Sequence, residues 1–201
     1  MDTFSAIQGR RSVKHYDADH KLSKSEIEKL LNLTLLAPTS FNIQHWRLIR
    51  ITDPQLRAQI RGLAWDQQQV TEASELIIFC GDVGAWDKQP QRYWQNAPAE
   101  SQSVIINMLG DFYRGREFLQ RDEAIRSCAI AAQTLMLAAH AMGYGSCPMI
   151  GFDFDKVAEL IRLPDDHVAA MMVTIGKPLQ PGSPRGGQLP LDEVVFENSF
   201  S

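Results

Sequence analysis

Residues 123–142 read EAIRSCAIAAQTLMLAAHAM, and this stretch decides the fold more than any other part of the chain. Its length suits a long helix, and its apolar residues lie almost all round rather than on one stripe, which is typical of a helix surrounded by protein. Gly143 and Gly145 follow it, and glycine commonly ends a helix. We therefore expect a buried central helix around which the other elements pack.

Patterns of helices and strands alternate around this helix. Ser23-x-x-Glu26 is a capping box, and the helix that it opens should end before Pro38, because the residue before a proline avoids the helical region. Residues 76–80 form a continuous apolar run, which predicts a strand covered on both faces. Further strands are expected at 46–51 and 168–175, and further helices at 3–8, 54–63, 100–118 and 153–162. The sequence thus predicts one α+β domain over residues 1–201, with a mixed central sheet covered by helices.

Length and composition limit the classes of function. A chain of 201 residues suits a single domain, and its formal net charge of −4 argues against a nucleic-acid-binding protein. The longest apolar stretch, around 127–142, is interrupted by Gln133 and His140 and is too short for a membrane span. The first residues lack the features of a signal peptide, and the three cysteines are far apart, so we expect a cytoplasmic protein.

Residues 10–14, Arg-Arg-Ser-Val-Lys, place three cations and a hydroxyl group within five positions. Guanidinium groups bind phosphate through parallel charge-assisted hydrogen bonds. We interpret Arg10, Arg11 and Ser12 as cofactor-binding residues, of which Arg10 and Ser12 would contact a phosphate and a ribityl chain. Lys14 would stabilise a ring edge that becomes negative on reduction. The alternative is a solvated basic turn.

Residues 37–46, Ala-Pro-Thr-Ser-Phe-Asn-Ile-Gln-His-Trp, combine amide and hydroxyl side chains with aromatic ones. Ser40, Asn42 and Gln44 alternate with apolar residues, so they would share one face of an extended segment. A flat polar heterocycle needs amides at its edge and apolar surface on its faces. Together with residues 10–14, this segment suggests a site for flavin mononucleotide (FMN). A polar loop that caps the preceding helix is the alternative.

Four motifs, in order along the chain, resemble those of the FMN-dependent nitroreductase family. They are Arg10-Arg11-Ser12-x-Lys14-x-Tyr16, Ser40-x-Asn42-x-Gln44-x-Trp46, Pro148-Met149-Ile150-Gly151-Phe152-Asp153, and Gly176-Lys177-Pro178 with Arg185 downstream. The resemblance implies a nitroreductase-like fold, an intertwined homodimer with shared FMN sites, and NADH or NADPH as reductant. It also implies that hydride passes through flavin N5, in a ping-pong cycle, to an electrophilic small molecule such as a nitroaromatic or a quinone. No catalytic side chain is expected, because the cofactor carries the chemistry.

The resemblance assigns further residues to the cofactor. Asp66 and Gln69 would meet the pyrimidine edge of the ring, and Arg185 would bind the phosphate. The backbone of residues 148–151 (Pro148, Met149, Ile150 and Gly151) would lie against the ring near N5, where Gly151 permits close approach. Ser40, Asn42 and Gln44 would come from the other subunit. This chain departs from the family pattern at four positions. The family often has proline at the place of His45, an acidic residue at the place of Ile150 and lysine at the place of Ser183. Some members have lysine at the place of Gln69.

Aromatic residues are the candidates for the substrate pocket. The region around 111–118 overhangs the exposed flavin face in the family, so the residues that could stack on a planar substrate are Phe41, Phe112, Tyr113 and Phe118. The alternative is that these aromatic side chains fix a helix to the core. The five histidines lack metal-ligand spacing, so we expect no metal site.

The segment 177–201 is rich in proline and glycine and carries little core of its own. A short strand predicted at 193–196 suggests that this tail packs on the partner subunit. Two rival functions stay open. One keeps the fold but changes the flavin reaction, to dehalogenation or to reduction of an enone or aldehyde; the other is a flavin-binding dimer without turnover.

Overall fold

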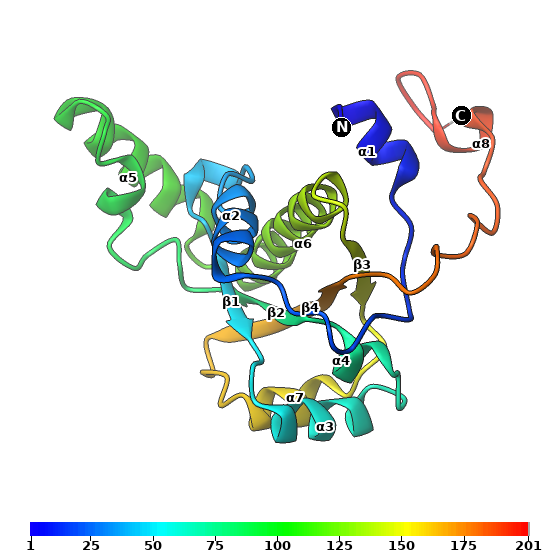
Figure 1. Ribbon diagram of the computed structural model, residues 1–201. Helices are drawn as coiled ribbons and strands as arrows, with labels where there is room; N and C mark the ends of the chain where they lie inside the picture. Colours follow the sequence, from blue (N-terminus) through cyan, green and yellow to red (C-terminus); the bar gives the residue numbers. More distant parts are fainter. Residues whose placement is uncertain (201) are drawn as a thin grey trace.

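Figure 1 shows the computed structural model, which describes residues 1–200 as a four-stranded sheet with helices on both faces. The strands are β1 (Trp46–Arg50), β2 (Glu75–Asp82), β3 (Gly145–Met149) and β4 (His167–Gly176), in the spatial order β1-β2-β4-β3. All three neighbouring pairs are antiparallel. The α+β class is confirmed, but the sheet that these strands form is not mixed. Alternation of helices and strands along the chain does not fix the direction in which each strand enters the sheet.

Helix α6 (Glu117–Ala141) lies across one face of the sheet, as predicted for the central helix. Ala131 and Leu135 are fully buried and pack in one hydrophobic cluster with Ile77 and Phe79 of β2. The helix begins at Glu117, earlier than expected, because helix α5 (Ala99–Tyr113) also ends earlier than residue 118. Between them, Gly115 adopts a φ of 69°, a left-handed conformation that suits glycine and separates the two helices.

Shorter helices cover the other face of the sheet: α3 (Pro54–Leu63), α4 (Gln69–Glu72) and α7 (Phe154–Leu160). Side chains alternate along β2, so Leu76 and Ile78 pack with Ile60 of α3 and Val157 of α7, away from α6. Every residue of β2 is buried. This confirms the prediction that residues 76–80 form a strand covered on both faces.

Helix α2 (Lys24–Thr34) packs beside α6 and begins with the predicted capping box. The backbone N–H of Glu26 donates to Ser23 Oγ at 3.3 Å, and the N–H of Ser23 donates to Glu26 Oε2 at 2.8 Å. The helix ends before the turn that leads to Pro38. Two short 3₁₀ helices, η1 (Ser40–Asn42) and η2 (Pro90–Trp94), follow α2 and β2 respectively.

The two ends of the chain lie on the β3 side of the molecule, where α1 (Thr3–Gly9) and the C-terminal tail are neighbours (Figure 1). The predicted strand at 193–196 is wrong, because Leu191–Val194 form the short helix α8. Acidic residues occupy the first turn of this helix, which favours helix formation. Within residues 1–200, no helix has the length and apolar character that crossing a bilayer requires.

Candidate functional site

Two segments distant in sequence enclose a cavity of about 460 Å³ beside β3, which we call the cationic cavity. Residues 10–14 run along β3, where the Val13 N–H donates to the Ser146 carbonyl oxygen at 3.0 Å. The tail crosses them at Gly182, where a Cβ atom would stand 2.7 Å from the Ser12 carbonyl oxygen. The side chains brought together here include Arg10, Arg11, Ser12, Lys14, Ser183 and Arg185. All the predicted phosphate contacts thus line one cavity.

The charges of the cationic cavity are not balanced by the chain itself. No carboxylate lines it, and within residues 1–200 none lies within salt-bridge distance of its four cations. Burial, together with the neighbouring Arg185 and Arg11, lowers the pKa of Arg10. Nη1 of Arg10 and Oγ of Ser146 are buried without a hydrogen-bond partner. A buried donor left unpaired costs about 1–3 kcal/mol, so this donor set fits an anion with several oxygen acceptors, such as the phosphate of FMN.

Residues 148–151 follow the cationic cavity along β3, which sequence reasoning did not identify as a strand. Ile150 is exposed, and Gly151 lies against the ring of Trp65, where a Cβ atom would stand 2.6 Å from Trp65 Cζ3. Within this chain, the group that lies closest to Gly151 is therefore the indole ring of Trp65. Trp65 is itself 79% exposed, and both it and Asp66 have left-handed φ angles. Strained backbone that presents an exposed aromatic ring often marks a functional site, and this conformation is not visible in the sequence.

The loop that carries Asp66 and Gln69 contacts residues 148–151 through a different side chain. Asp66 accepts a hydrogen bond from Arg61 at 2.7 Å and faces solvent. Gln69 is buried and donates to Gln67 Oε1 at 2.9 Å, while Gln67 Nε2 donates to the Gly151 carbonyl oxygen at 3.3 Å. Gln67 therefore connects this loop to the 148–151 segment.

The segment from Ser40 to Gln44 is not extended, contrary to the prediction. Phe41, Asn42 and Gln44 have φ angles of 49°, 54° and 54°, so the chain is tightly coiled before β1 begins. Asn42 Nδ2 donates to the Tyr93 carbonyl oxygen at 2.8 Å, and the Gln44 N–H donates to Thr39 Oγ1 at 3.0 Å. Alternation in sequence predicts one polar face only if the backbone is extended, and here the local hydrogen bonds favour a turn.

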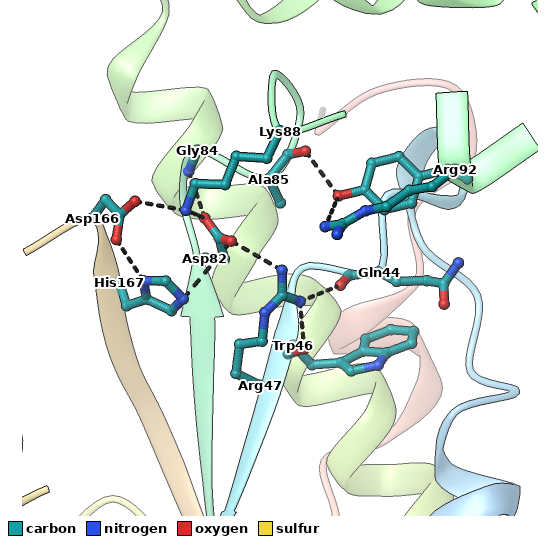
Figure 2. Close-up of polar contacts among 11 residues, drawn as sticks. Gln44, Trp46, Arg47, Asp82, Gly84, Ala85, Lys88, Arg92, Asp166 and His167 are labelled. Carbon is teal, nitrogen blue, oxygen red and sulfur yellow. Dashed lines mark hydrogen bonds and ion pairs between the residues drawn. The ribbon is translucent and has the colours of Figure 1, made fainter. Parts of the chain in front are cut away.

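An ion network holds this segment against the sheet (Figure 2). The buried carboxylate of Asp82, at the end of β2, pairs with Arg47 at 3.0 Å and with Lys88 at 2.7 Å. Arg47 also donates to the Gln44 carbonyl oxygen at 3.1 Å, which fixes the end of the 40–44 segment. Asp166 and His167 adjoin Asp82, and these three residues could offer ligands to a metal ion. However, Lys88 bridges both carboxylates, so cations of the chain already neutralise them.

The predicted aromatic residues differ in their exposure. Phe41 and Phe112 pack at a centroid distance of 5.8 Å, Phe112 is partly exposed, and Phe118 is 70% exposed. Tyr113 is completely buried, and its hydroxyl donates to Ser40 Oγ at 2.8 Å. In this structure its ring is therefore not accessible to a ligand, and Tyr113 fixes α5 to the 40–44 segment.

His45 is buried on the N-terminal side of β1. Its Nδ1 lies 3.0 Å from Ser127 Oγ of α6, and burial lowers its pKa to about 4. The imidazole is therefore neutral near pH 7. His45 ties the 40–44 segment to the central helix and adds no charge to the site.

The predicted cofactor residues form two groups at opposite edges of the sheet. The cationic cavity, residues 148–151 and Gln67 lie on the β3 side, whereas residues 40–44 lead directly into β1. Gln44 instead lines a second cavity of about 660 Å³ beside β1, with Arg47, Arg92 and Tyr93. One chain thus presents the predicted site as two separate parts.

Known proteins resemble the chain over almost its entire length. A model of the Nitroreductase family matches residues 7–177. Protein DrgA of Synechocystis is 54% identical over 200 residues, which cover 97% of this chain and 95% of that protein. The candidate NAD(P)H nitroreductase MhqN of Bacillus subtilis is 31% identical over 196 residues, covering 94% of this chain and 95% of the relative. A crystal structure of a candidate nitroreductase from Exiguobacterium sibiricum in complex with FMN superposes with a TM-score of 0.90 at 30% identity, covering 98% of this chain and 97% of that one.

Proposed function

The chain belongs to the nitroreductase family, and from that premise we propose that it is a homodimeric, FMN-dependent oxidoreductase. It would pass hydride from NADH or NADPH to an electrophilic acceptor such as a nitroaromatic or a quinone. The observation that carries this proposal is the cationic cavity, with its unbalanced charges and the unpartnered Nη1 of Arg10. The solved relative in complex with FMN supports the choice of anion.

We assign Arg10, Ser12 and Arg185 to the phosphate, because guanidinium and hydroxyl donors converge on the cationic cavity. Lys14 is assigned to the ring edge that gains negative charge, where a fixed cation stabilises the reduced form. Residues 148–151, held by Gln67 and flanked by the exposed ring of Trp65, would form the surface against which the flavin lies. When bound, FMN would supply the two-electron chemistry that no side chain of this site can perform.

The separation of the two residue groups supports a shared site at a dimer interface. Residues 40–44 of one subunit would complete the site begun by the cationic cavity of the other. Ile130 of α6 is 42% exposed although it belongs to the central helix, which supports further cover by a second subunit.

The C-terminal tail is the segment that we expect to reach across this interface. Its apolar side chains are exposed in the single chain, where Leu191 is 77% and Phe200 91% accessible. It also carries Asp192, Glu193 and Glu197. The cavity beside β1 offers a complementary surface, because it is lined by the apolar Leu31 and Trp46 and by Arg92. Its two other arginines, Arg47 and Arg50, already pair with Asp82 and Glu75.

Steady-state oxidation of NADH and NADPH tests this function, measured with a nitroaromatic or a quinone as acceptor. We expect turnover well above that of the same concentration of free FMN. A protein that binds FMN but gives no such excess would support the rival function of a flavin-binding dimer. Release of FMN and conversion to monomers should occur together on dilution, and a monomer that keeps its flavin would overturn the shared site.

A further inference from the structure

The cationic cavity carries more positive charge than one FMN phosphate can neutralise. Four cations line it, Arg10, Arg11, Lys14 and Arg185, and no acidic side chain does. Lys14 is assigned to the ring edge, so three cations face the phosphate. A phosphate monoester contributes a charge of about −1.5 to −2 near neutral pH, so roughly one positive charge remains. Because the whole chain has a net charge of −4, this local excess does not follow from its composition. Like charges held together in one partly buried cavity are unfavourable unless an anion binds there.

Arg11, also predicted to bind the cofactor, is the cation to which the assignments above give no contact on FMN. Arg10 has the buried, unpartnered Nη1, and the tail brings Arg185 to the same cavity, so these two are assigned to the phosphate. Arg11 is half-buried, and its Nη1 donates to the carbonyl oxygens of Gln8 at 2.6 Å and Arg10 at 2.9 Å. These bonds hold the guanidinium at the end of α1. No hydrogen bond joins its Nε or Nη2 to residues 1–200, so one edge of the fork is available to a ligand.

The rim beside Arg11 has room for a second phosphate. Ser183 adds a hydroxyl group, and Gly186 and Gly187 follow it in the tail. A Cβ atom at either glycine would meet nothing within 4 Å, so the backbone there faces open space. Arginine and serine side chains with accessible backbone amides form a typical phosphate-binding group.

We propose that Arg11 and this rim bind the 2′-phosphate of NADPH, so that the protein selects NADPH over NADH as its reductant. The proposal rests on the proposed function, because it takes FMN and a dinucleotide as ligands of one site. The 2′-phosphate is the group that distinguishes the two reductants, and its negative charge would pair with the guanidinium of Arg11.

Equilibrium binding to the FMN-loaded protein tests the site without turnover. Adenosine 2′,5′-bisphosphate should bind about tenfold more tightly than AMP in calorimetric titrations, since one charge-assisted contact corresponds to at least that factor. Arg11→Gln should remove most of the difference, and Arg11→Lys, which keeps the charge but not the fork, should keep part of it. If 5′-ADP or inorganic phosphate competes as well as the 2′,5′-bisphosphate, the cavity recognises only charge and the proposal is wrong.

The ratio of kcat/KM for NADPH to that for NADH gives an independent test. We expect a ratio of about ten in the wild type, a ratio near one in Arg11→Gln, and an unchanged ratio in the control Lys24→Gln. The side chain of Lys24 is 90% exposed, and its replacement removes one positive charge elsewhere on the surface. A wild-type ratio near one in an FMN-loaded, active protein would overturn this inference and leave the proposed function standing. A protein that takes up no FMN would instead contradict the proposed function itself.

Discussion

Replacing Arg10 with methionine should weaken FMN binding without weakening the fold. The guanidinium lines a cavity with three other cations, and its buried Nη1 has no partner in residues 1–200. A hydrogen bond to a charged group is worth about 1.5–3 kcal/mol, so loss of this contact should raise the Kd for FMN about 10- to 150-fold. Quenching of flavin fluorescence during titration of flavin-free protein measures that Kd directly.

The same substitution should have a different effect on the flavin-free protein. Burial, Arg185 and Arg11 all disfavour the charge of Arg10, as the lowered pKa of this group indicates. Its removal should therefore leave the free energy of unfolding unchanged or raise it. With FMN at 100 times the wild-type Kd, the wild type should gain about 2.7 kcal/mol, whereas a variant that binds 100-fold more weakly should gain only about 0.4 kcal/mol.

Chemical unfolding with and without FMN separates the two effects. Lys24→Met is the matched control, because it removes an exposed charge outside the cavity and should change neither quantity. An Arg10→Met variant with the wild-type Kd would refute the assignment of Arg10 to the phosphate. A variant destabilised equally with and without FMN would show that Arg10 acts through the fold rather than through the ligand.

Two other substitutions and one deletion test the Gly151–Trp65 contact, the buried imidazole of His45 and the C-terminal tail. Gly151→Ala should displace the ring of Trp65, since the new Cβ atom would stand 2.6 Å from it. Tryptophan fluorescence should therefore change, but not in Gly62→Ala, where no atom lies within 4 Å; an unchanged spectrum would argue against the contact. Burial lowers the pKa of His45 to about 4 from 6.5, so the unfolded chain binds more protons between these values. Stability should consequently fall with decreasing pH by up to about 1.4 kcal/mol per unit, and His45→Gln should reduce this slope in denaturant titrations, whereas an equal slope in both proteins would exclude His45 as its source. Deletion of residues 189–201 should convert the dimer to a monomer in sedimentation experiments, and a truncated protein that stays dimeric would contradict the role of the tail.

Elements with a strong local signal could be predicted from the sequence. The capping box at Ser23 and Glu26 formed as expected, because its two hydrogen bonds depend only on neighbouring residues. The continuous apolar run of β2 indicated burial on both faces, and the structure confirms it. The family resemblance drawn from four short motifs is confirmed as well, by a match over residues 7–177.

Features that depend on distant contacts could not be predicted. Strand β3 contains Pro148 and lacks β-branched residues, and it forms because it lies at an edge of the sheet beside β4. The contact between Gly151 and Trp65 joins residues far apart in sequence, so neither position alone reveals it. The coiled 40–44 segment depends on Thr39 and on the carbonyl oxygen of Tyr93. Residue type therefore predicted that Arg10, Ser12 and Arg185 gather at one cavity, whereas the extended conformation expected for residues 40–44 was wrong.

The central claim is that the cationic cavity holds the phosphate of FMN, and comparison of FMN with riboflavin tests it most directly. The two flavins share the ring and the ribityl chain and differ only in the phosphate. We predict that flavin-free protein binds FMN at least about 100-fold more tightly than riboflavin, since two or more charge-assisted contacts would be lost. Equal dissociation constants would contradict the account, because Arg10 and Arg185 would then contribute nothing to binding of the phosphate.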